Sequence, residues 1–298
     1  MPQGSILGPL LFLLYINDLP QATNFFVRLF ADDTFLCAQN KDLLALESHV
    51  NFELQKVYNW LASNRLSLNM DKSKFMLISN KKRIIPLSVN INELQLKECN
   101  SYKYLGIFID KKLTWQAHIQ HICKKISKAS GALSKLRHCV SIDTLINVYY
   151  ALVHSYLRYG ILAWGTASST VLEPLKVLSN RVVKIMTFAP FGNVPLHPIF
   201  KCLEILDIPQ IFDHETAKFL FKAKNNLLPC SIGNYFPMRE YADNHEFNHE
   251  QPPKIVCRLV SSEKSLQHRE IELWNSIPIE IKSCVSPHSF KKQYKSHL

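Results

Sequence analysis

The chain has 298 residues, of which 47% are hydrophobic and 20% are charged, so it can bury a core and is not disordered as a whole. Lys and Arg number 35 against 24 Asp and Glu, which gives a formal net charge of +11 and favours a polyanionic partner. The eight cysteines are scattered without a Cys-x-x-Cys pair, which excludes a disulfide scaffold and fits a reducing compartment.

The first predicted element is a helix at about residues 9–19, which follows a Pro-Gln-Gly-Ser loop at 2–5. The apolar run Ile6–Ile16 is too short to span a bilayer, which needs about 20 residues. No basic residue precedes it, because the first cation is Arg28, so the run also differs from a signal peptide. We predict that this helix is buried.

A strand hairpin and a long helix follow. The apolar runs Val27–Phe30 and Phe35–Ala38 flank an Ala-Asp-Asp-Thr sequence and predict two paired strands. Apolar residues at spacings of three and four predict a helix from about Lys41 to Ser63. Strand-like pieces come next, at Lys74–Ser79, Leu87–Ile91 and Tyr102–Ile109. This order of elements is typical of an α+β fold.

The chain is predicted to be mainly helical from about Thr114 onwards. Helices are expected at about 115–138, 142–159 and 171–188, the last with a capping box formed by Thr170 and Glu173. Beyond Pro190 the prolines multiply, which predicts a loop-rich region whose clearest helix lies at about 210–226.

The positive charge is concentrated around the first of these helices. Residues 1–71 carry 4 basic and 7 acidic side chains, residues 72–140 carry 14 and 3, and residues 141–298 carry 17 and 14. On a helical wheel for residues 115–138, an apolar arc and a basic arc point away from each other. The basic arc holds four lysines, and two more precede the helix: Lys124, Lys125, Lys128 and Lys135, with Lys111 and Lys112.

Such a stripe of lysines is suited to tracking a phosphate backbone. A solvated helix face is the alternative interpretation, but no acidic side chain lies between residues 111 and 137. We therefore expect these lysines to contact nucleic acid.

Asp32 and Asp33 lie between the two hairpin strands. Most Asp pairs in this position only form a turn. A carboxylate pair at a tight hairpin tip can also bind divalent metals, since Mg²⁺ prefers one or two carboxylates together with substrate phosphates. The loop at 2–9 precedes a helix whose free N–H groups would favour a phosphate.

Together these segments resemble a known family. Pro-Gln-Gly-Ser-Ile-Leu-Gly-Pro-Leu-Leu-Phe at 2–12, followed by Phe-Ala-Asp-Asp-Thr at 30–34, resembles two motif blocks of the reverse transcriptase palm. The likeness is closest to non-LTR (LINE-type) retrotransposons of the jockey-like group. Later segments that resemble the same family are Asn69–Met76, Tyr102–Ile107, Leu113–Ile119, Leu157–Gly160, Trp164-Gly165, Trp274–Pro278 and Ser289–Lys291.

The resemblance implies a role for each matching residue. Asp32 and Asp33 would be the metal ligands, and Lys72 would lie near the triphosphate, where its charge assists the leaving pyrophosphate. Gln3, Gly4 and Ser5 would form the loop near the template and incoming nucleotide, and Leu105 and Gly106 would position the primer end. Two alternatives stay open: Lys72 and Lys74 as solvated strand-edge cations, and Gly106 as a residue that only supplies turn geometry.

The resemblance also implies the domains and ligands. Residues 1–110 would be the C-terminal part of the palm, 111–165 a basic helical thumb and 166–298 a helical, loop-rich extension. The cofactor would be Mg²⁺ or Mn²⁺, and the partners an RNA template, a DNA primer and deoxynucleoside triphosphates. We expect no membrane association and an intracellular location in the nucleus, the cytoplasm or both.

The family site uses a further Asp from a strand that precedes the Pro-Gln-Gly-Ser loop, and this chain begins at Met1, directly before that loop. We therefore expect that the chain alone does not polymerise, because two-metal chemistry would lack part of its ligand set. The alternative function is a non-catalytic nucleic-acid-binding remnant or a protein derived from a retrotransposon; a structural or interaction protein is a third reading.

Two further groups of residues were weighed as sites. Cys230, His245, His249 and Cys257 have one spacing suited to zinc, but no Cys-x-x-Cys pair anchors them, and unrelated residues of a polar loop are the better interpretation. The aromatic residues Tyr149, Tyr150, Tyr156, Tyr159 and Trp164 could stack bases, but their helical spacing favours a place in the core or at its edge.

Overall fold

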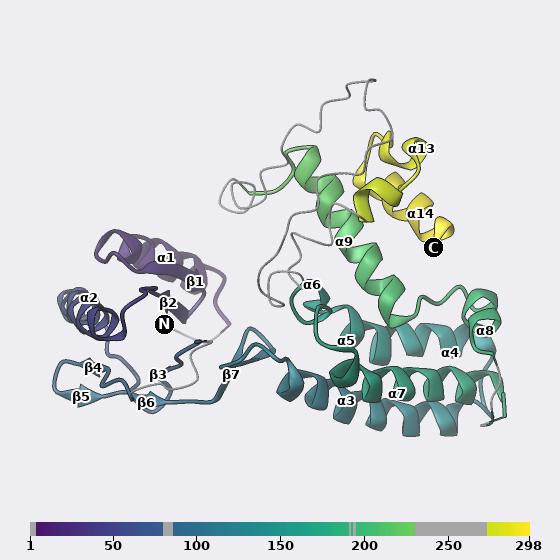
Figure 1. Ribbon diagram of the computed structural model, residues 1–298, viewed down its shortest axis with the longest axis horizontal. Coiled ribbons are helices and arrows are strands. Elements are labelled where there is room, and N and C mark those ends of the chain that lie inside the picture. The colour runs from purple at the N-terminus through teal and green to yellow at the C-terminus, as the bar shows by residue number, and fades with distance from the viewer. Residues whose placement is uncertain (1–3, 80–85, 191, 193–194, 230–272) are drawn as a thin grey trace. The chain divides into compact units, whose positions relative to one another are not determined.

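The computed structural model describes residues 4–79, 86–190, 192, 195–229 and 273–298. The chain divides into two compact units. The first comprises Met1–Tyr102 with Asp110–Leu113, and the second comprises Lys103–Ile109 with Thr114–Leu298. Figure 1 shows the first unit as a mixture of helices and small strands and the second unit as largely helical. The predicted three-part division into palm, thumb and extension stays a prediction.

The first unit mixes helices with short strands, as the α+β prediction requires. In chain order its elements are α1 (Leu7–Ile16), a 3₁₀ turn (Leu19–Gln21), β1 (Phe26–Phe30), β2 (Asp33–Cys37), α2 (Leu43–Ser63), β3 (Lys74–Phe75), β4 (Asn90–Ile91), β5 (Leu94–Gln95) and β6 (Lys97–Glu98). β1 pairs with β2 and β4 with β5 in antiparallel fashion, and β3 pairs with β6 in parallel. Strands β5 and β6 were not expected from the sequence, because each is only two residues long and too short to show an alternating pattern.

The prediction that the first helix is buried is wrong. Leu10 is 54% exposed and Leu14 is 69% exposed, although both are strongly apolar. Only one face of α1 is covered by the described residues: Gly8 and Ile16 are buried, and Phe12 packs against the core of the unit. A helix that is apolar all round needs cover on every side, and the described part of the first unit provides it on one side only.

The predicted hairpin and long helix are confirmed, and they form the core of the first unit. Leu54 and Val57 of α2 are buried together with Phe25 and Val27 around the start of β1. The helix begins where the Asp42 carboxylate accepts a hydrogen bond from the Ala45 N–H at 3.1 Å, which supplies the N-terminal cap. The hairpin therefore lies on a helix whose start is fixed by local sequence.

A buried carboxylate of α2 ties the hairpin to the helix. Glu53 is 1% exposed, and its oxygens accept hydrogen bonds from the Thr23 hydroxyl at 2.8 Å and the Asn24 N–H at 2.7 Å. Lys56 forms an ion pair with Glu53 at 2.8 Å. Burial by itself would raise the pKa of Glu53, but the bonds from Lys56, Asn24 and Thr23 outweigh it and lower the pKa to about 2.

The second unit is built from helices and the β7–β8 hairpin. Its helical elements are α3 (Gln116–Leu136), α4 (Ile142–Tyr149), a π-helical turn (Tyr150–His154), α5 (Ser155–Arg158), α6 (Ile161–Trp164), α7 (Ser169–Thr187), α8 (His197–Cys202), α9 (Ile208–Lys224), α13 (Ile279–Lys282) and α14 (Pro287–His297). The hairpin strands are β7 (Ser101–Tyr104) and β8 (Ile107–Asp110), so the boundary between the two units runs through the hairpin.

The helices predicted around 115–138, 142–159, 171–188 and 210–226 are confirmed as α3, α4 to α5, α7 and α9. The helix predicted at 142–159 contains the π-helical turn Tyr150–His154, which the spacing of its apolar residues does not predict. The predicted capping box is wrong, because α7 begins at Ser169, one residue before Thr170. The N-cap residue of α7 is Ser168, and its side chain makes no capping hydrogen bond to the helix backbone.

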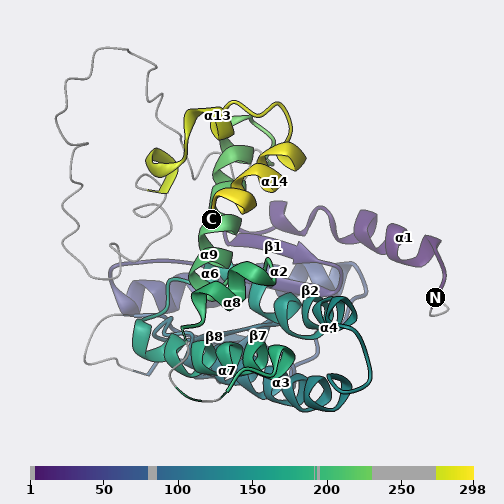
Figure 2. The ribbon, with the colours of Figure 1, turned by 90° about the vertical axis from the view of Figure 1, so that its right-hand side faces the viewer.

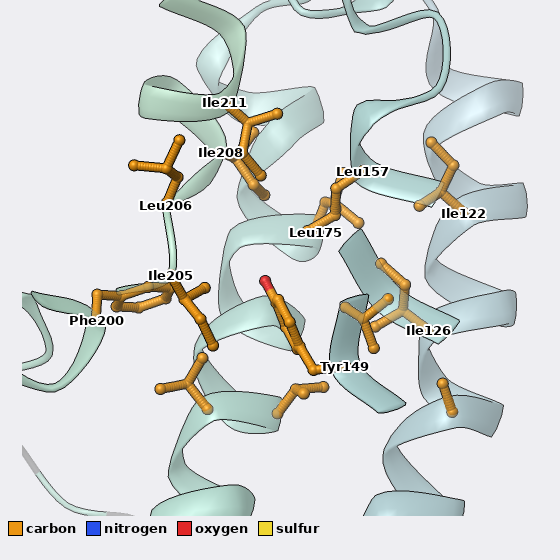
Figure 3. Close-up of a cluster of buried hydrophobic side chains, with 14 of the residues drawn as sticks. Ile122, Ile126, Tyr149, Leu157, Leu175, Phe200, Ile205, Leu206, Ile208 and Ile211 are labelled. Atoms are coloured by element: carbon orange, nitrogen blue, oxygen red, sulfur yellow. The ribbon is translucent and has the colours of Figure 1, made fainter. Parts of the chain in front are cut away.

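One large apolar core holds α3 to α9 together. Helices α3 and α7 lie side by side in Figures 1 and 2, and both contribute residues to this core. Figure 3 shows Tyr149 of α4 between Ile126 of α3 and Ile205, with Leu175 of α7 nearby. A smaller core joins α9 to the C-terminal helices, where the rings of Phe221 and Phe290 stack with centroids 4.4 Å apart. In the described part of the chain, no helix is long and apolar enough to cross a membrane.

We predict that Glu53→Gln destabilises the first unit. The amide loses the ion pair with Lys56 and leaves buried donors poorly satisfied, which costs about 1–3 kcal/mol of unfolding free energy. Urea unfolding at pH 7 of the variant and of a Glu47→Gln control on the same helix measures the difference. Because the folded pKa of Glu53 lies below its ordinary value of 4.5, the advantage of the unchanged protein is complete above pH 4.5 and shrinks as the pH falls towards 2. Equal unfolding midpoints for the two variants would contradict the assigned role.

Candidate functional site

The Asp pair lies at the tip of the β1–β2 hairpin. Phe30 pairs with Asp33, so only Ala31 and Asp32 form the turn between the strands. Ala31 has φ = 50°, a left-handed conformation that suits such a two-residue turn. Both Asp32 and Asp33 are exposed. The hairpin thus presents two adjacent carboxylates to solvent without burying their charge.

These two carboxylates are hard oxygen donors of the kind that Mg²⁺ prefers, and one or two of them are enough when water and phosphates complete the shell. In the part of the chain that the structure describes, no group of three or more His, Cys, Asp or Glu could hold a metal ion. Asp32 and Asp33 therefore fit a metal as a partial ligand set. The zinc alternative involving Cys230 and Cys257 lies outside the described residues.

The loop before α1 is only partly described, because Gln3 lies outside the described residues. Gly4 has φ = 89°, which favours glycine. The Ser5 hydroxyl accepts a hydrogen bond from the Gly8 N–H at 3.2 Å, so it occupies one of the free donors at the start of the helix. The predicted roles of Gln3, Gly4 and Ser5 stay predictions.

Lys72 lies in a turn organised by Asn69. The Asn69 side-chain oxygen accepts from the Lys72 N–H at 3.2 Å, and the Asn69 carbonyl accepts from the Ser73 hydroxyl at 2.8 Å. This turn leads directly into β3, and it leaves Lys72 exposed. Lys72 was expected as a site residue, but the structural role of Asn69 was not. An Asn three residues before Lys72 is a common turn-forming residue and could have indicated it.

Leu105 and Gly106 form the turn of the β7–β8 hairpin, with φ values of 46° and 85°. The Leu105 carbonyl accepts a hydrogen bond from the Tyr159 hydroxyl at 2.6 Å. A Cβ atom at Gly106 would lie 3.3 Å from the Tyr159 ring. The turn therefore favours glycine at 106, as expected if Gly106 only supplies turn geometry. Its role in positioning the primer stays a prediction.

The aromatic residues weighed as base-stacking candidates divide into two groups. Tyr149 and Trp164 are fully buried in the core, and Tyr150 is partly buried against it. Tyr156 and Tyr159 are 38% and 54% exposed. The prediction of core or core-edge positions therefore describes the first group, while the second group leaves ring surface open to solvent.

The predicted basic face of α3 is present. Ile119, Ile122, Ile126, Ala129 and Leu133 are buried, whereas Lys124, Lys125, Lys128 and Lys135 are exposed on the opposite side. None of the four lysines forms an ion pair with another described residue. Their charges are thus available to a ligand.

Lys111 and Lys112 belong to the first unit and not to the unit of α3. Lys111 forms an ion pair with Glu98, while Lys112 is exposed. The sequence interpretation grouped both residues with the stripe because they precede it in the chain; the structure describes them as part of a different compact unit.

Comparison with known proteins agrees with the sequence resemblance. Residues 1–109 match the family model for reverse transcriptase (RNA-dependent DNA polymerase). The chain is 27% identical over 203 residues to the RNA-directed DNA polymerase from mobile element jockey of Drosophila melanogaster, which covers 64% of this chain and 22% of that protein. It is 27% identical over 270 residues to the probable RNA-directed DNA polymerase from transposon X-element of the same species, covering 87% of this chain and 29% of the relative.

The chain therefore spans less than a third of the length of these relatives. No solved structure matches it significantly. The predicted resemblance to non-LTR retrotransposon reverse transcriptases is confirmed by these relatives, and residues 1–109 match the broader reverse transcriptase family.

We predict that Gly106→Ala destabilises the protein by about 1–3 kcal/mol, because a left-handed backbone conformation is strained for alanine and the new methyl group presses on Tyr159. Gly131→Ala is the matched control: Gly131 lies within α3, and an added Cβ there meets nothing within 4 Å. It is expected to stabilise the helix by about 0.5–1 kcal/mol. Thermal unfolding of both variants measures the effects, and a neutral Gly106→Ala would show that the turn tolerates another conformation.

Proposed function

We propose that this chain forms part of the palm of an RNA-directed DNA polymerase of the non-LTR retrotransposon type and that α3 binds nucleic acid. The observation that carries the proposal is the match of residues 1–109 to the reverse transcriptase family, with the exposed Asp32 and Asp33 at the tip of a tight hairpin inside that region. The partners would be an RNA template, a DNA primer and deoxynucleoside triphosphates.

In this proposal three residues of the first unit, Asp32, Asp33 and Lys72, bind the metal and the triphosphate. Asp32 and Asp33 would bind Mg²⁺ or Mn²⁺, which neutralises phosphate charge and activates the primer 3′ hydroxyl when bound. The Lys72 ammonium, exposed on its turn, would lie near the triphosphate and stabilise the charge of the departing pyrophosphate. Leu105 and Gly106 would position the primer end.

The stripe on α3 would hold the nucleic-acid backbone. Four exposed lysines on one side of a helix, unpaired with described carboxylates, can each replace a counterion at a phosphate. The helix itself is anchored by its opposite, apolar side, so the lysines are presented on a rigid element.

A second function, non-catalytic nucleic-acid binding, is favoured by one specific observation. In the described part of the chain, the Asp pair is not joined by a third metal-binding side chain. A two-metal reaction with only two carboxylates from the protein would be severely impaired. The two functions share the nucleic-acid surface and differ only in the chemistry at the hairpin.

We predict that the chain binds single-stranded nucleic acid with an affinity that falls steeply as salt increases. Fluorescence anisotropy with a labelled oligonucleotide at 50 to 300 mM salt would give the slope of log affinity against log salt. Replacing Lys124 and Lys128 together by Ala is expected to reduce that slope by about 1.4, from two lost phosphate contacts on a single strand. Lys201 of α8 and Lys222 of α9, which are exposed and form no ion pair with another described residue, are replaced together as the control pair. An unchanged slope for the Lys124/Lys128 variant would remove α3 from the binding surface.

We predict that Mn²⁺ binds at the hairpin tip and that Asp32→Asn or Asp33→Asn abolishes this binding. Paramagnetic broadening of the backbone amide signals of residues 31–34 is the measurement, and Asp71→Asn, an exposed residue outside the hairpin, is the control. Primer extension by the purified chain with Mg²⁺ or Mn²⁺ is expected to be undetectable, because the described residues supply only part of the ligand set. Robust extension that is lost in Asp32→Asn would establish the polymerase function for this chain, whereas broadening that survives both hairpin substitutions would refute the proposed metal site.

A further inference from the structure

A pocket of the second unit lies where the β7–β8 hairpin meets α3 and α5. It has a volume of about 490 Å³, within the usual range for small-molecule sites. Its lining residues come from three segments of the chain, and all of them belong to the second unit: Lys103, Gly106, His118, His121, Ile122, Lys125, Ser155, Tyr156 and Tyr159. Of the pocket's residues, the sequence analysis gave a binding role to Gly106 and Lys125 and weighed Tyr156 and Tyr159 as stacking candidates.

The pocket is positively charged. Lys103 and Lys125 are exposed and form no ion pair with another described residue. Burial, followed by the charges of Lys125, Lys103 and Lys124, lowers the pKa of His121 below its ordinary value. The positive charges of Lys103 and Lys125 therefore act on the same space that an anionic ligand would occupy.

His118 adds a buried donor beside these charges. Its Nδ1 accepts a hydrogen bond from the Phe108 N–H at 3.4 Å, so in the neutral ring Nε2 carries the proton. The residue is 3% exposed, and burial lowers its pKa to about 4, with a smaller contribution from His121. Nε2 has no hydrogen-bond partner among the described residues. A buried donor without an acceptor is uncommon, and this one belongs to a residue that lines the pocket.

Two tyrosine rings complete the lining. Tyr159 is fixed by its hydrogen bond to the Leu105 carbonyl, and its ring lies against Gly106. Tyr156 lies three residues earlier in the chain and is 38% exposed. Rings held in this way and partly open to solvent can stack on a nucleobase.

We propose that this pocket binds one nucleotide of a nucleic-acid strand, with the phosphate at Lys103 and Lys125 and the base against Tyr156 and Tyr159. A nucleotide is the ligand that combines an anion, hydrogen-bond acceptors and an aromatic ring in a volume of this size. The proposal rests on the proposed function, since it assigns a site within a surface that binds nucleic acid. It adds stacking, which is not screened by salt, to the charge-based contacts of the α3 stripe.

The test is oligonucleotide binding by the full chain and its variants, measured by anisotropy with a labelled 12-nucleotide single strand. Tyr156→Ala is expected to weaken binding by about 5- to 100-fold, the range found for losing one base stack, and to do so at both 50 and 300 mM salt. Tyr156→Phe keeps the ring and is expected to keep most of the affinity. Far-ultraviolet circular dichroism and the thermal midpoint confirm that each variant is folded.

A double-variant comparison separates the pocket from the stripe. Combining Tyr156→Ala with Lys125→Ala is expected to weaken binding by less than the product of the two single effects, because both act on the same nucleotide. Combining Tyr156→Ala with Lys128→Ala, whose lysine lies outside the pocket, is expected to give the full product.

The outcomes distinguish the two proposals. If the unchanged chain does not bind the strand at any salt concentration, the proposed function and this inference both fail. If it binds in a salt-dependent way but Tyr156→Ala has no effect, or the Lys125 combination gives the full product, only the pocket assignment fails. Competition by adenosine monophosphate at concentrations equal to those of the strand would overturn the assignment to a strand and make the pocket a site for free nucleotides.

Discussion

The first unit depends on a carboxylate that is removed from water. Glu53 accepts hydrogen bonds from the segment that precedes β1 and an ion pair from Lys56 on its own helix. A buried charge is tolerated only when its oxygens are satisfied, so this group fixes the segment directly before β1 against the middle of α2. The positions of Asp32 and Asp33 follow, because the hairpin has a two-residue turn and its register leaves no freedom at the tip. The position of the exposed Asp32 and Asp33 thus depends on the buried Glu53 carboxylate.

In the second unit, several lysines lie close together on α3 without ion pairs to described carboxylates. Helix α3 packs its isoleucines into the large core and points its lysines outward. The mutual repulsion of the lysines is offset by that apolar anchorage and not by ion pairs with described residues. The β7–β8 turn is held by Tyr159 of the same unit, so the pocket beside α3 is bounded by rigid elements on both sides.

Local patterns in the sequence predicted the features that depend on local physics. The apolar spacing of α2 and α3, the hairpin around the Asp pair and the resemblance to reverse transcriptases all follow from residues close together in the chain. What could not be predicted depends on partners far away in sequence. The exposure of Leu10 and Leu14 depends on how much cover the rest of the unit provides. The pairing of Glu53 with Thr23 spans 30 residues, and the tie from Tyr159 to Leu105 spans 54. The roles of the candidate site residues stay predictions, because neither the fold nor the comparisons test them.

The uncovered side of α1 gives this chain two surfaces with opposite responses to its solvent. Added salt screens the lysines of α3 and weakens their hold on a polyanion. Strongly hydrated salts such as sulfate have the reverse effect on the leucines of α1, since exclusion of these salts from apolar surface favours its burial. Low salt therefore preserves the binding surface of the second unit and leaves the leucines of α1 in contact with water. Sulfate at high concentration releases nucleic acid from α3 and at the same time favours contact of these leucines with another apolar surface.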